Sequence, residues 1–346
     1  MHDVVDLRSD TLTRPTPAMR EAMARADVGD DVYEEDPTVR RLETLAAERL
    51  GKDAALFVTS GTQGNLVSVL AQTRPGQEVV LDAYAHIFNA EVASAAVIGG
   101  VQMRPTMTER GFLSPAQVRE ALRPANIHIP PTGLVCIENT HNRHGGTCCT
   151  PEDIAAVAGV AHEARVPVHL DGARIFNAAV ALGRPARDFA RDVDSITFCI
   201  SKGLGAPVGS LVCGSAEFIG GARRVRKMLG GGMRQAGIIA AAGIVALERM
   251  VDRLAEDHVN ARALAEGLAT LPRLSVDLAS VQTNIVILRI DRPGGADELV
   301  AGCSSRKVKL HAMSPTFIRC VTHKDVDADD IRRALDAFTE ITKGWR

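Results

Sequence analysis

Lys202 is the residue of this sequence whose setting most favours covalent chemistry. It follows the apolar segment Ser195–Ile200 and precedes the glycine-rich run Gly203–Gly205. A lysine at the end of a buried strand is partly desolvated, which lowers its pKa and favours the neutral amine that attacks carbonyl groups. The competing interpretation is a lysine at a strand end that simply faces solvent. Residues at other strand ends distinguish the two.

A carboxylate and a guanidinium follow another expected strand, Val166–Leu170. Asp171 and Arg174 lie on one short loop, Asp171-Gly172-Ala173-Arg174. They would either pair as a salt bridge or divide two tasks. In the second case the buried carboxylate keeps a pyridine nitrogen protonated, and the arginine holds a substrate carboxylate through two parallel hydrogen bonds. The loop alone leaves both interpretations open.

A third strand end offers an anion site. Ser60-Gly61-Thr62 follows the expected strand Ala55–Thr59 and leads into a helix, where backbone N–H groups favour a phosphate. A simple helix cap is the alternative. Because ligands of open α/β sheets lie beyond the carboxyl ends of the strands, the three strand ends together supply partners for the phosphate, the pyridinium and the aldehyde of one cofactor.

The elements that position these residues are those of an α/β fold. From about residue 54 to 215, short apolar segments alternate with helical patterns, which predicts βα units around a mostly parallel sheet. We expect strands at Ala55–Thr59, Glu78–Leu81, Leu134–Glu138, Val166–Leu170, Ser195–Ile200 and Ser210–Cys213, and helices at Gln63–Gln72, Pro115–Leu122 and Pro151–Ala164.

The pattern changes after Gly232, which predicts a second, smaller domain. Helices are expected at Ala236–Met250 and His258–Leu271, and a small α/β unit at Asn284–Arg289, Ala296–Arg306, Phe317–Val321 and Ala328–Lys343. We therefore divide the chain into a large domain, residues 1–250, and a small C-terminal domain, residues 251–346.

Composition excludes several classes of partner. The 346 residues are 46% hydrophobic and 24% charged, with a net charge of −2, and no basic stripe indicates a nucleic-acid or membrane surface. The longest apolar run, Ala236–Leu247, is too short to span a bilayer, and the N-terminus lacks the apolar core of a signal peptide, so we expect a cytoplasmic protein. The seven cysteines form no CxxC pair and the ten histidines no HExxH motif, so we expect buried free thiols and no metal.

A series of motifs spans nearly the whole chain: DLRSDTLTRPTPAM (Asp6–Met19), GDDVYEEDPTV (Gly29–Val39), SGTQGN (Ser60–Asn65), the segment around His86, IENTHN (Ile137–Asn142), HLDGARIFNA (His169–Ala178), SKGLGAPVGS (Ser201–Ser210) and GGGMRQAG (Gly230–Gly237). In order and spacing they resemble fold-type I pyridoxal 5′-phosphate (PLP) enzymes, and within them the low-specificity L-threonine aldolases of the β-eliminating lyase group. The resemblance implies that fold, with the N-terminal segment 1–16 packing near the active site.

The resemblance assigns the cofactor-binding residues. Lys202 resembles the Schiff-base lysine, Asp171 the partner of the pyridine nitrogen, and Gly61 with Thr62 the phosphate cradle. His86 resembles the histidine that stacks on the cofactor ring, and its position makes it a candidate for the proton of the β-hydroxyl. Without the resemblance, His86 would be interpreted as a core or surface histidine.

The resemblance also assigns the substrate side. Ser9, Arg174 and Arg319 resemble the substrate-carboxylate binders, with Arg174 also near the cofactor and Arg319 arriving from the small domain. Tyr33 and His128 resemble residues near the β-carbon substituent, and a solvent-facing role is the alternative for both. His128 is a second catalytic candidate, acting through a shared water.

Arg234 resembles a residue that reaches the phosphate of a neighbouring subunit. The resemblance therefore implies a homo-oligomer, a tetramer built from dimers with shared active sites. One departure lies nearby, because Glu34 follows Tyr33 where the family commonly has glycine. Since glycine accepts backbone angles that glutamate disfavours, we expect this loop to be reshaped.

The implied reaction is reversible cleavage of L-threonine, L-allo-threonine and related β-hydroxy-α-amino acids to glycine and an aldehyde. Another fold-type I lyase or aminotransferase reaction on a small amino acid is the alternative. A PLP-binding regulator is a third possibility, but the sequence has no helix-turn-helix segment of the kind that such proteins carry.

Overall fold

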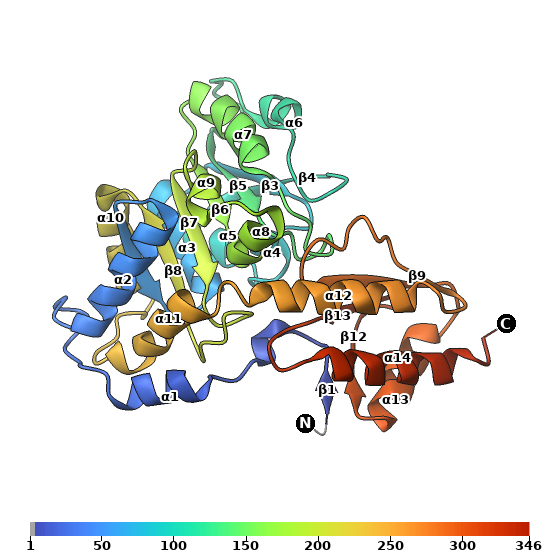
Figure 1. Cartoon of the computed structure of the whole chain (residues 1–346). Coiled ribbons are helices and arrows are strands. Elements are labelled where there is room, and N and C mark those ends of the chain that lie inside the picture. Colours follow the sequence, from blue (N-terminus) through green and yellow to red (C-terminus); the bar gives the residue numbers. More distant parts are fainter. Residues whose placement is uncertain (1–3, 346) are drawn as a thin grey trace.

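A seven-stranded sheet forms the centre of the large domain (Figure 1). The computed structural model describes residues 4–345. In spatial order the strands are β2 (Ala54–Val58), β8 (Ser210–Gly214), β7 (Ser195–Cys199), β6 (Val168–Asp171), β5 (Thr132–Glu138), β3 (Glu78–Asp82) and β4 (Gln102–Thr106). Every neighbouring pair is parallel except the two that involve β8. The predicted α/β class with a mostly parallel sheet is confirmed.

Helices cover both faces of this sheet. The helices are α1 (Pro17–Ala24), α2 (Pro37–Leu50), α3 (Gly61–Gln72), α4 (His86–Asn89), α5 (Ser94–Gly99), α6 (Pro115–Ala121), α7 (Pro151–Glu163), α8 (Ile175–Leu182), α9 (Ala186–Ala190), α10 (Ala216–Met228) and α11 (Gly237–Arg249). Val80 belongs to the core under α2, α7, α8 and α11, whereas Val79 and Leu81 belong to the core under α3 and α5. Burial on both faces explains why the strands are almost continuously apolar.

A second core lies in the C-terminal part of the chain. Its sheet has the order β12 (His311–Ser314), β13 (Phe317–Val321), β10 (Ile285–Ile290) and β9 (Leu274–Ser275), and it packs with α12 (Leu254–Leu268), α13 (Gly295–Ser305) and α14 (Ala328–Thr342). The N-terminal strand β1 (Val5–Asp6) pairs with β11 (Val308–Lys309). Val5 and Leu7 therefore belong to this second core, although they begin the chain.

Some elements were not predicted. β4 contains Arg104 and Pro105 and carries few apolar residues, because it lies at the sheet edge, where a proline removes no ladder hydrogen bond that a central strand would need. Helix α2 was missed although it carries clear end signals, with Asp36 capping its start, Pro37 in its first turn and Gly51 in a left-handed conformation at its end.

Two further features of the structure concern the cysteines and the apolar helices. All seven cysteines are buried and free, as predicted. Among the helices of residues 4–345, none is both long and apolar enough to cross a bilayer.

Candidate active site

Three chain segments meet beyond the carboxyl ends of the central strands. Asp171 is the last residue of β6, which pairs in parallel with β7, and Lys202 follows β7 by three residues. The start of α3 packs on the end of β7, since a Cβ added to Gly61 would lie 2.9 Å from Cys199 Sγ. The structure therefore brings the predicted phosphate cradle to the two strands that carry the carboxylate and the lysine.

The start of α3 has the features of both a helix cap and an anion site. Ser60 caps the helix, because its Oγ accepts a hydrogen bond from the Gln63 N–H at 3.1 Å. Beside Gly61, the buried Ser210 Oγ has no hydrogen-bond partner within residues 4–345, and a Cβ on Gly61 would lie 3.8 Å from it. An unpaired buried hydroxyl next to a helix N-terminus suits a phosphate oxygen.

Asp171 does not pair with Arg174, so the salt-bridge interpretation is wrong. Its carboxylate is 2% exposed and accepts hydrogen bonds from Asn65 Nδ2 at 2.8 Å and from the Ala173 N–H at 3.1 Å. Both donors are neutral, and no lysine or arginine of the described chain forms an ion pair with this carboxylate. A buried charge with only neutral partners favours a cationic ligand, such as a protonated pyridine nitrogen.

Arg174 instead binds Asp10. Its Nε and Nη2 donate to the two carboxylate oxygens at 2.7 Å each, and both side chains are buried. Burial raises the pKa of Asp10, but Arg174 and the nearby Lys202 more than offset it, so the pKa lies far below its ordinary value. The Asp10 carboxylate thus fixes the position of the arginine, and Lys202 lies close enough to stabilise the charge of this carboxylate.

Arg319 is a cation without an ion-pair partner in the described residues. Its Nη1 donates to Asn142 Oδ1 at 2.8 Å and its Nη2 to the Arg8 carbonyl at 3.3 Å, while its buried Nε has no partner. Burial and the charge of Arg174 lower the pKa of Arg319. Two neighbouring guanidinium groups, one of them incompletely paired, form an electropositive site for an anion.

The N-terminal segment links these groups. Ser9 lies between Arg8, whose carbonyl accepts from Arg319, and Asp10, which binds Arg174. A few residues further on, Thr13 Oγ1 donates to the Lys202 carbonyl at 2.9 Å. The structure therefore brings Ser9, Arg174 and Arg319 together beside the lysine segment, as the predicted substrate-carboxylate site requires.

His86 lies near Asp171 and is oriented by a buried glutamate. Its Nδ1 is 2.7 Å from Glu91 Oε1, and ligand atoms of His86, Glu91 and Asp171 lie within 4.8 Å of one another. The hydrogen bond to Glu91 raises the pKa of His86 in spite of burial. If Nδ1 donates to Glu91, Nε2 is left as the basic atom of the ring.

Asp171 is held by a series of hydrogen bonds that runs through the neutral side chains of Asn65, His169 and Ser195. Asn65 donates to both Asp171 and Glu91 at 2.8 Å, and its Oδ1 is 3.2 Å from His169 Nε2. His169 Nδ1 is in turn 2.8 Å from Ser195 Oγ. Burial lowers the pKa of His169 to about 4, so its ring is neutral and donates from Nε2 to Asn65.

The lowered pKa of His169 predicts that the folded protein loses stability at acid pH. Between pH 6.5 and about 4 the unfolded chain gains a proton on His169 that the folded chain does not, so stability is lost as pH falls through this window. We expect a loss of roughly 3 kcal/mol by pH 4 from this group. Thermal midpoints at neutral pH and at about pH 4.5 measure it. The drop should be smaller in His169→Gln and unchanged in the control His162→Gln, an exposed histidine; equal drops in all three proteins would contradict the assignment.

Three predicted site residues lie away from this centre. The Tyr33 side chain is 73% exposed, His128 is on the exposed loop before β5, and Arg234 is exposed with Nη1 3.1 Å from Asp30 Oδ2. Asp30 also accepts from the Tyr33 N–H, so Tyr33 and Arg234 share one exposed surface. Among residues 4–345, none of the three forms a hydrogen bond or ion pair with Lys202 or Asp171.

The loop that carries Tyr33 accommodates Glu34 without glycine. Glu34 adopts a left-handed backbone conformation with φ of 59°, and its carboxylate pairs with Arg223 Nε at 3.0 Å. The expectation that this residue reshapes the loop is therefore wrong for the backbone at this position. Glu34 keeps the backbone geometry that glycine favours, at a cost of about 1 kcal/mol.

Sequence reasoning missed the residues that hold the site residues in place. These are Asp10, Asn65, Glu91, Glu138 and Asn142, which bind Arg174, Asp171, His86 and Arg319 through side-chain contacts. All lie inside the quoted motifs or within five residues of His86, so proximity to a motif is the signal that could have found them. Except for Glu91, which binds His86 five residues away, these partners lie at least 52 residues away in the chain.

We compared the sequence with protein families and with known proteins. The sequence matches the beta-eliminating lyase family over residues 6–291. It is 45% identical over 343 residues to a probable low-specificity L-threonine aldolase 2 of Arabidopsis thaliana, covering 97% of each chain.

Solved structures share the fold at much lower identity. A threonine aldolase of Leishmania major has a TM-score of 0.85 and 20% identity, covering 98% of this chain and 99% of that one. A serine palmitoyltransferase of Sphingomonas wittichii has a TM-score of 0.77 and 17% identity, covering 98% and 87%. One fold thus carries more than one reaction in these similar proteins, so the choice of reaction depends on the site residues.

Proposed function

This chain belongs to the beta-eliminating lyase family, and from that premise we propose that it is a PLP-dependent lyase that cleaves L-threonine, L-allo-threonine and related β-hydroxy-α-amino acids to glycine and an aldehyde. The observation that carries the proposal is the pair of neighbouring guanidinium groups of Arg174 and Arg319, the latter with a buried, unpartnered Nε. The carboxylate of an amino acid supplies the missing partner.

The residues beyond the strand ends fit PLP group by group. Gly61, Thr62 and the unpaired Ser210 hydroxyl suit the phosphate, and the buried Asp171 carboxylate suits a protonated pyridine nitrogen. Lys202 supplies the amine for the aldehyde. When bound, PLP supplies an electron sink for the electron pair released at the substrate Cα.

The residues of this chain then orient the substrate and move one proton. Arg174 and Arg319 hold the carboxylate at one end of the substrate, and Ser9 lies beside them. A substrate held at its carboxylate and its amine has only one rotation left, so this clamp decides which bond at Cα is broken. Arg319 lies on β13 in the C-terminal part of the chain. Binding of the substrate carboxylate by Arg319 therefore depends on where the C-terminal part lies relative to the central sheet.

His86 is proposed to accept the proton of the β-hydroxyl through Nε2. Glu91 is a positioning residue, because its contact with Nδ1 directs Nε2 away from the buried carboxylate. Loss of the hydroxyl proton drives cleavage of the Cα–Cβ bond and release of the aldehyde, and delivery of one proton to Cα then yields glycine, so the overall reaction balances. A single base that reaches the hydroxyl directly or through water accepts both configurations of the β-carbon, which supports activity on both threonine epimers.

The first test of His86 is its replacement by alanine. We expect kcat to fall about 10²- to 10⁴-fold, the usual contribution of a general base, while the cofactor stays bound because Lys202 and Asp171 are intact. Stopped-flow turnover and the visible absorption of the cofactor measure the two effects separately. Unchanged turnover would remove His86 from the role of base.

A second subunit is proposed to complete the site. Tyr33 and Arg234 share an exposed surface, and His128 is exposed on another loop. We propose that these residues contact the site of a neighbouring subunit, with Arg234 at the phosphate and with Tyr33 and His128 at the β-substituent. The assembly proposed is a homotetramer built from such dimers.

Product analysis tests the proposed function. The purified holoenzyme is incubated with L-threonine and, separately, with L-allo-threonine, and glycine and acetaldehyde are quantified. We expect equimolar glycine and acetaldehyde from both epimers, with the reverse reaction detectable from the same products. A keto acid would indicate an aminotransferase instead. A holoenzyme that releases acetaldehyde from neither epimer would contradict the proposal.

A further inference from the structure

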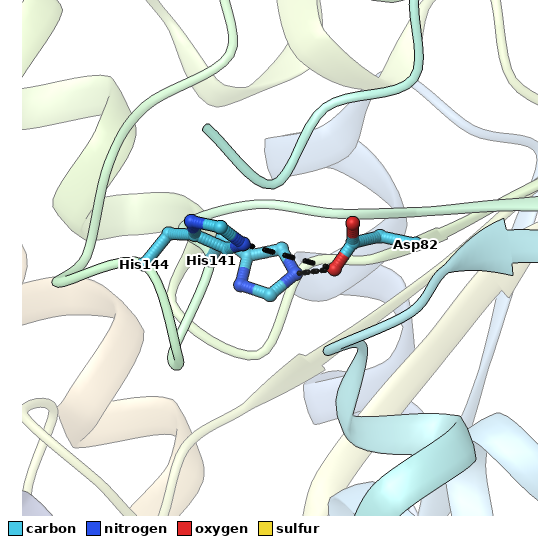
Figure 2. Close-up of side chains that lie close together, drawn as sticks. All are labelled: Asp82, His141 and His144. Carbon is cyan, nitrogen blue, oxygen red and sulfur yellow. Dashed lines mark ion pairs between the residues drawn. The ribbon is translucent and has the colours of Figure 1, made fainter. Parts of the chain in front are cut away.

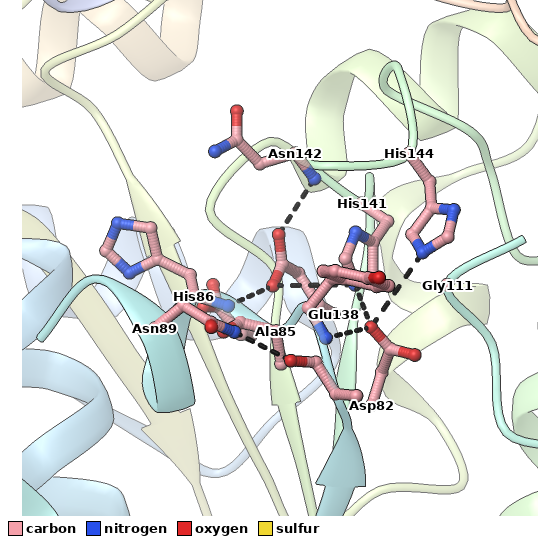
Figure 3. A network of polar contacts seen from close by, with 12 residues as sticks. Asp82, Ala85, His86, Asn89, Gly111, Glu138, His141, Asn142 and His144 are labelled. Carbon is pink, nitrogen blue, oxygen red and sulfur yellow. Dashed lines mark hydrogen bonds and ion pairs between the residues drawn. The ribbon is translucent and has the colours of Figure 1, made fainter. Parts of the chain in front are cut away.

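Two histidines and an aspartate converge on the far side of Glu138 from His86 (Figures 2 and 3). Asp82 ends β3, whereas His141 and His144 lie on the turn that follows β5. The Nε2 atom of His141 is 3.0 Å from Asp82 Oδ1, and that of His144 is 3.9 Å from the same oxygen. The side chains of His141 and Asp82 are 0% and 4% exposed, and that of His144 is 18% exposed.

The nitrogen atoms of this cluster have no hydrogen-bond partners within residues 4–345. Both ring nitrogens of His141 and Nε2 of His144 are buried and unpaired, so the 3.0 Å contact with Asp82 has the distance of an ion pair without the alignment of a hydrogen bond. A buried imidazole nitrogen without a partner is costly, and a ligand that binds His141 Nε2 would remove that cost for one of its two nitrogens. This Nε2 lies 3.0 Å from the Asp82 carboxylate, and a ligand atom of His144 lies within 4.8 Å of both groups.

We propose that Asp82, His141 and His144 bind a divalent transition-metal ion of the zinc class. With bond lengths of about 2.0–2.1 Å, two ligands of a tetrahedral ion lie about 3.3 Å apart. The distances of 3.0 and 3.9 Å bracket this value, and all three ligand atoms lie within 4.8 Å of one another. Two imidazoles and one carboxylate are a ligand set that zinc accepts with water in the fourth position.

The surroundings hold the ligands in place. A Cβ on Gly111 would lie 2.5 Å from the His141 ring, so the glycine backbone packs directly on the imidazole. Thr108 Oγ1 donates to Asp82 Oδ2 at 2.7 Å, which is the outer-shell contact that orients a carboxylate ligand. His144 also lines a cavity of about 890 Å³ between this turn and the small sheet, which gives an ion a path to the site.

The site is joined to the active site through Glu138. Its Oε2 accepts from the His86 N–H at 2.6 Å and lies 4.0 Å from His141 Nε2, and its Oε1 accepts from the Asn142 N–H at 2.8 Å (Figure 3). An ion bound here ties the turn to β3. It thereby stiffens the backbone that holds His86, and the Asn142 side chain that contacts Arg319.

Metal binding to the holoenzyme tests the inference independently of turnover. Protein treated with a chelator is dialysed against Zn²⁺, and bound zinc is counted by mass spectrometry and titrated by calorimetry. We expect one more zinc ion per chain in the wild type than in His144→Ala, with the affinity of this site lowered at least about 100-fold by that change. Thr108→Val should lower it about tenfold, the usual effect of losing an outer-shell contact.

The matched control is His162→Ala. His162 is 44% exposed and its Nε2 is 2.9 Å from Asp194 Oδ2, so it has a carboxylate partner but no second histidine. This variant should bind zinc as the wild type does. Equal zinc binding by the wild type and His144→Ala would overturn the proposal, as would equal losses in His144→Ala and His162→Ala. Because cofactor and cysteines are the same in all four proteins, neither accounts for a difference.

Discussion

Replacing Lys202 by alanine is expected to abolish covalent retention of the cofactor and to lower kcat at least about 10⁴-fold, the scale on which removal of a covalent-catalysis group acts. Lys202 follows β7 by three residues and lies near Asp10, which also binds Arg174. Among residues 4–345, no other lysine lies at the end of a central strand next to the substrate-carboxylate site. We therefore expect no other amine to bind the cofactor aldehyde in the variant.

Borohydride reduction followed by peptide mapping measures this effect directly. In the wild type the cofactor mass should remain on the peptide that contains Lys202, and in Lys202→Ala on none. Lys324→Ala is the matched control, because Lys324 contacts the same turn near Gly205 but pairs with Asp325. Retention of the cofactor mass by Lys202→Ala, or its loss from Lys324→Ala, would contradict the assignment.

The sequence was sufficient to predict those strands whose apolar pattern matches their burial in the folded protein. The apolar segments of β5 and β7 are buried on both faces, so their composition alone identified them. The edge strand β4 and the strand β1 have no such constraint. β1 pairs with β11, about 300 residues away in the chain, and only tertiary contact reveals that pairing.

The same distinction holds for the site. The positions of Lys202 and Asp171 follow from their strands, so their place at the carboxyl ends of the neighbouring strands β6 and β7 could be predicted from the sequence. The partner of Arg174 could not be predicted, because Asp171 is three residues away in the sequence but the actual partner, Asp10, is 164 residues away. Asp171 accepts a hydrogen bond from Asn65 on α3, whereas the guanidinium of Arg174 reaches Asp10 in the N-terminal segment.

Asp171→Asn is expected to lower kcat about 10³-fold while leaving the fold intact. The amide has the shape of the carboxylate, and its oxygen can still accept from Asn65. Its NH₂ group replaces the oxygen that accepts from the Ala173 N–H, and it is a donor toward the pyridine nitrogen. That nitrogen can no longer be kept protonated, so the capacity to stabilise negative charge at Cα is lost. The change also removes a buried charge without an ion-pair partner, so the apoprotein should become more stable.

Three measurements together test this prediction: kcat, the absorption maximum of the bound cofactor, and the thermal midpoint of the apoprotein. Glu91→Gln is the matched control, since Glu91 is a second buried carboxylate that shares the Asn65 donor. It keeps an acceptor for His86, so kcat should fall less than about tenfold and the cofactor absorption should not shift. A purely structural role for Asp171 predicts the opposite pattern, a less stable apoprotein with the absorption maximum unchanged. Lower activity combined with a shifted absorption maximum and a raised midpoint is therefore a result that only the electrostatic role of Asp171 explains.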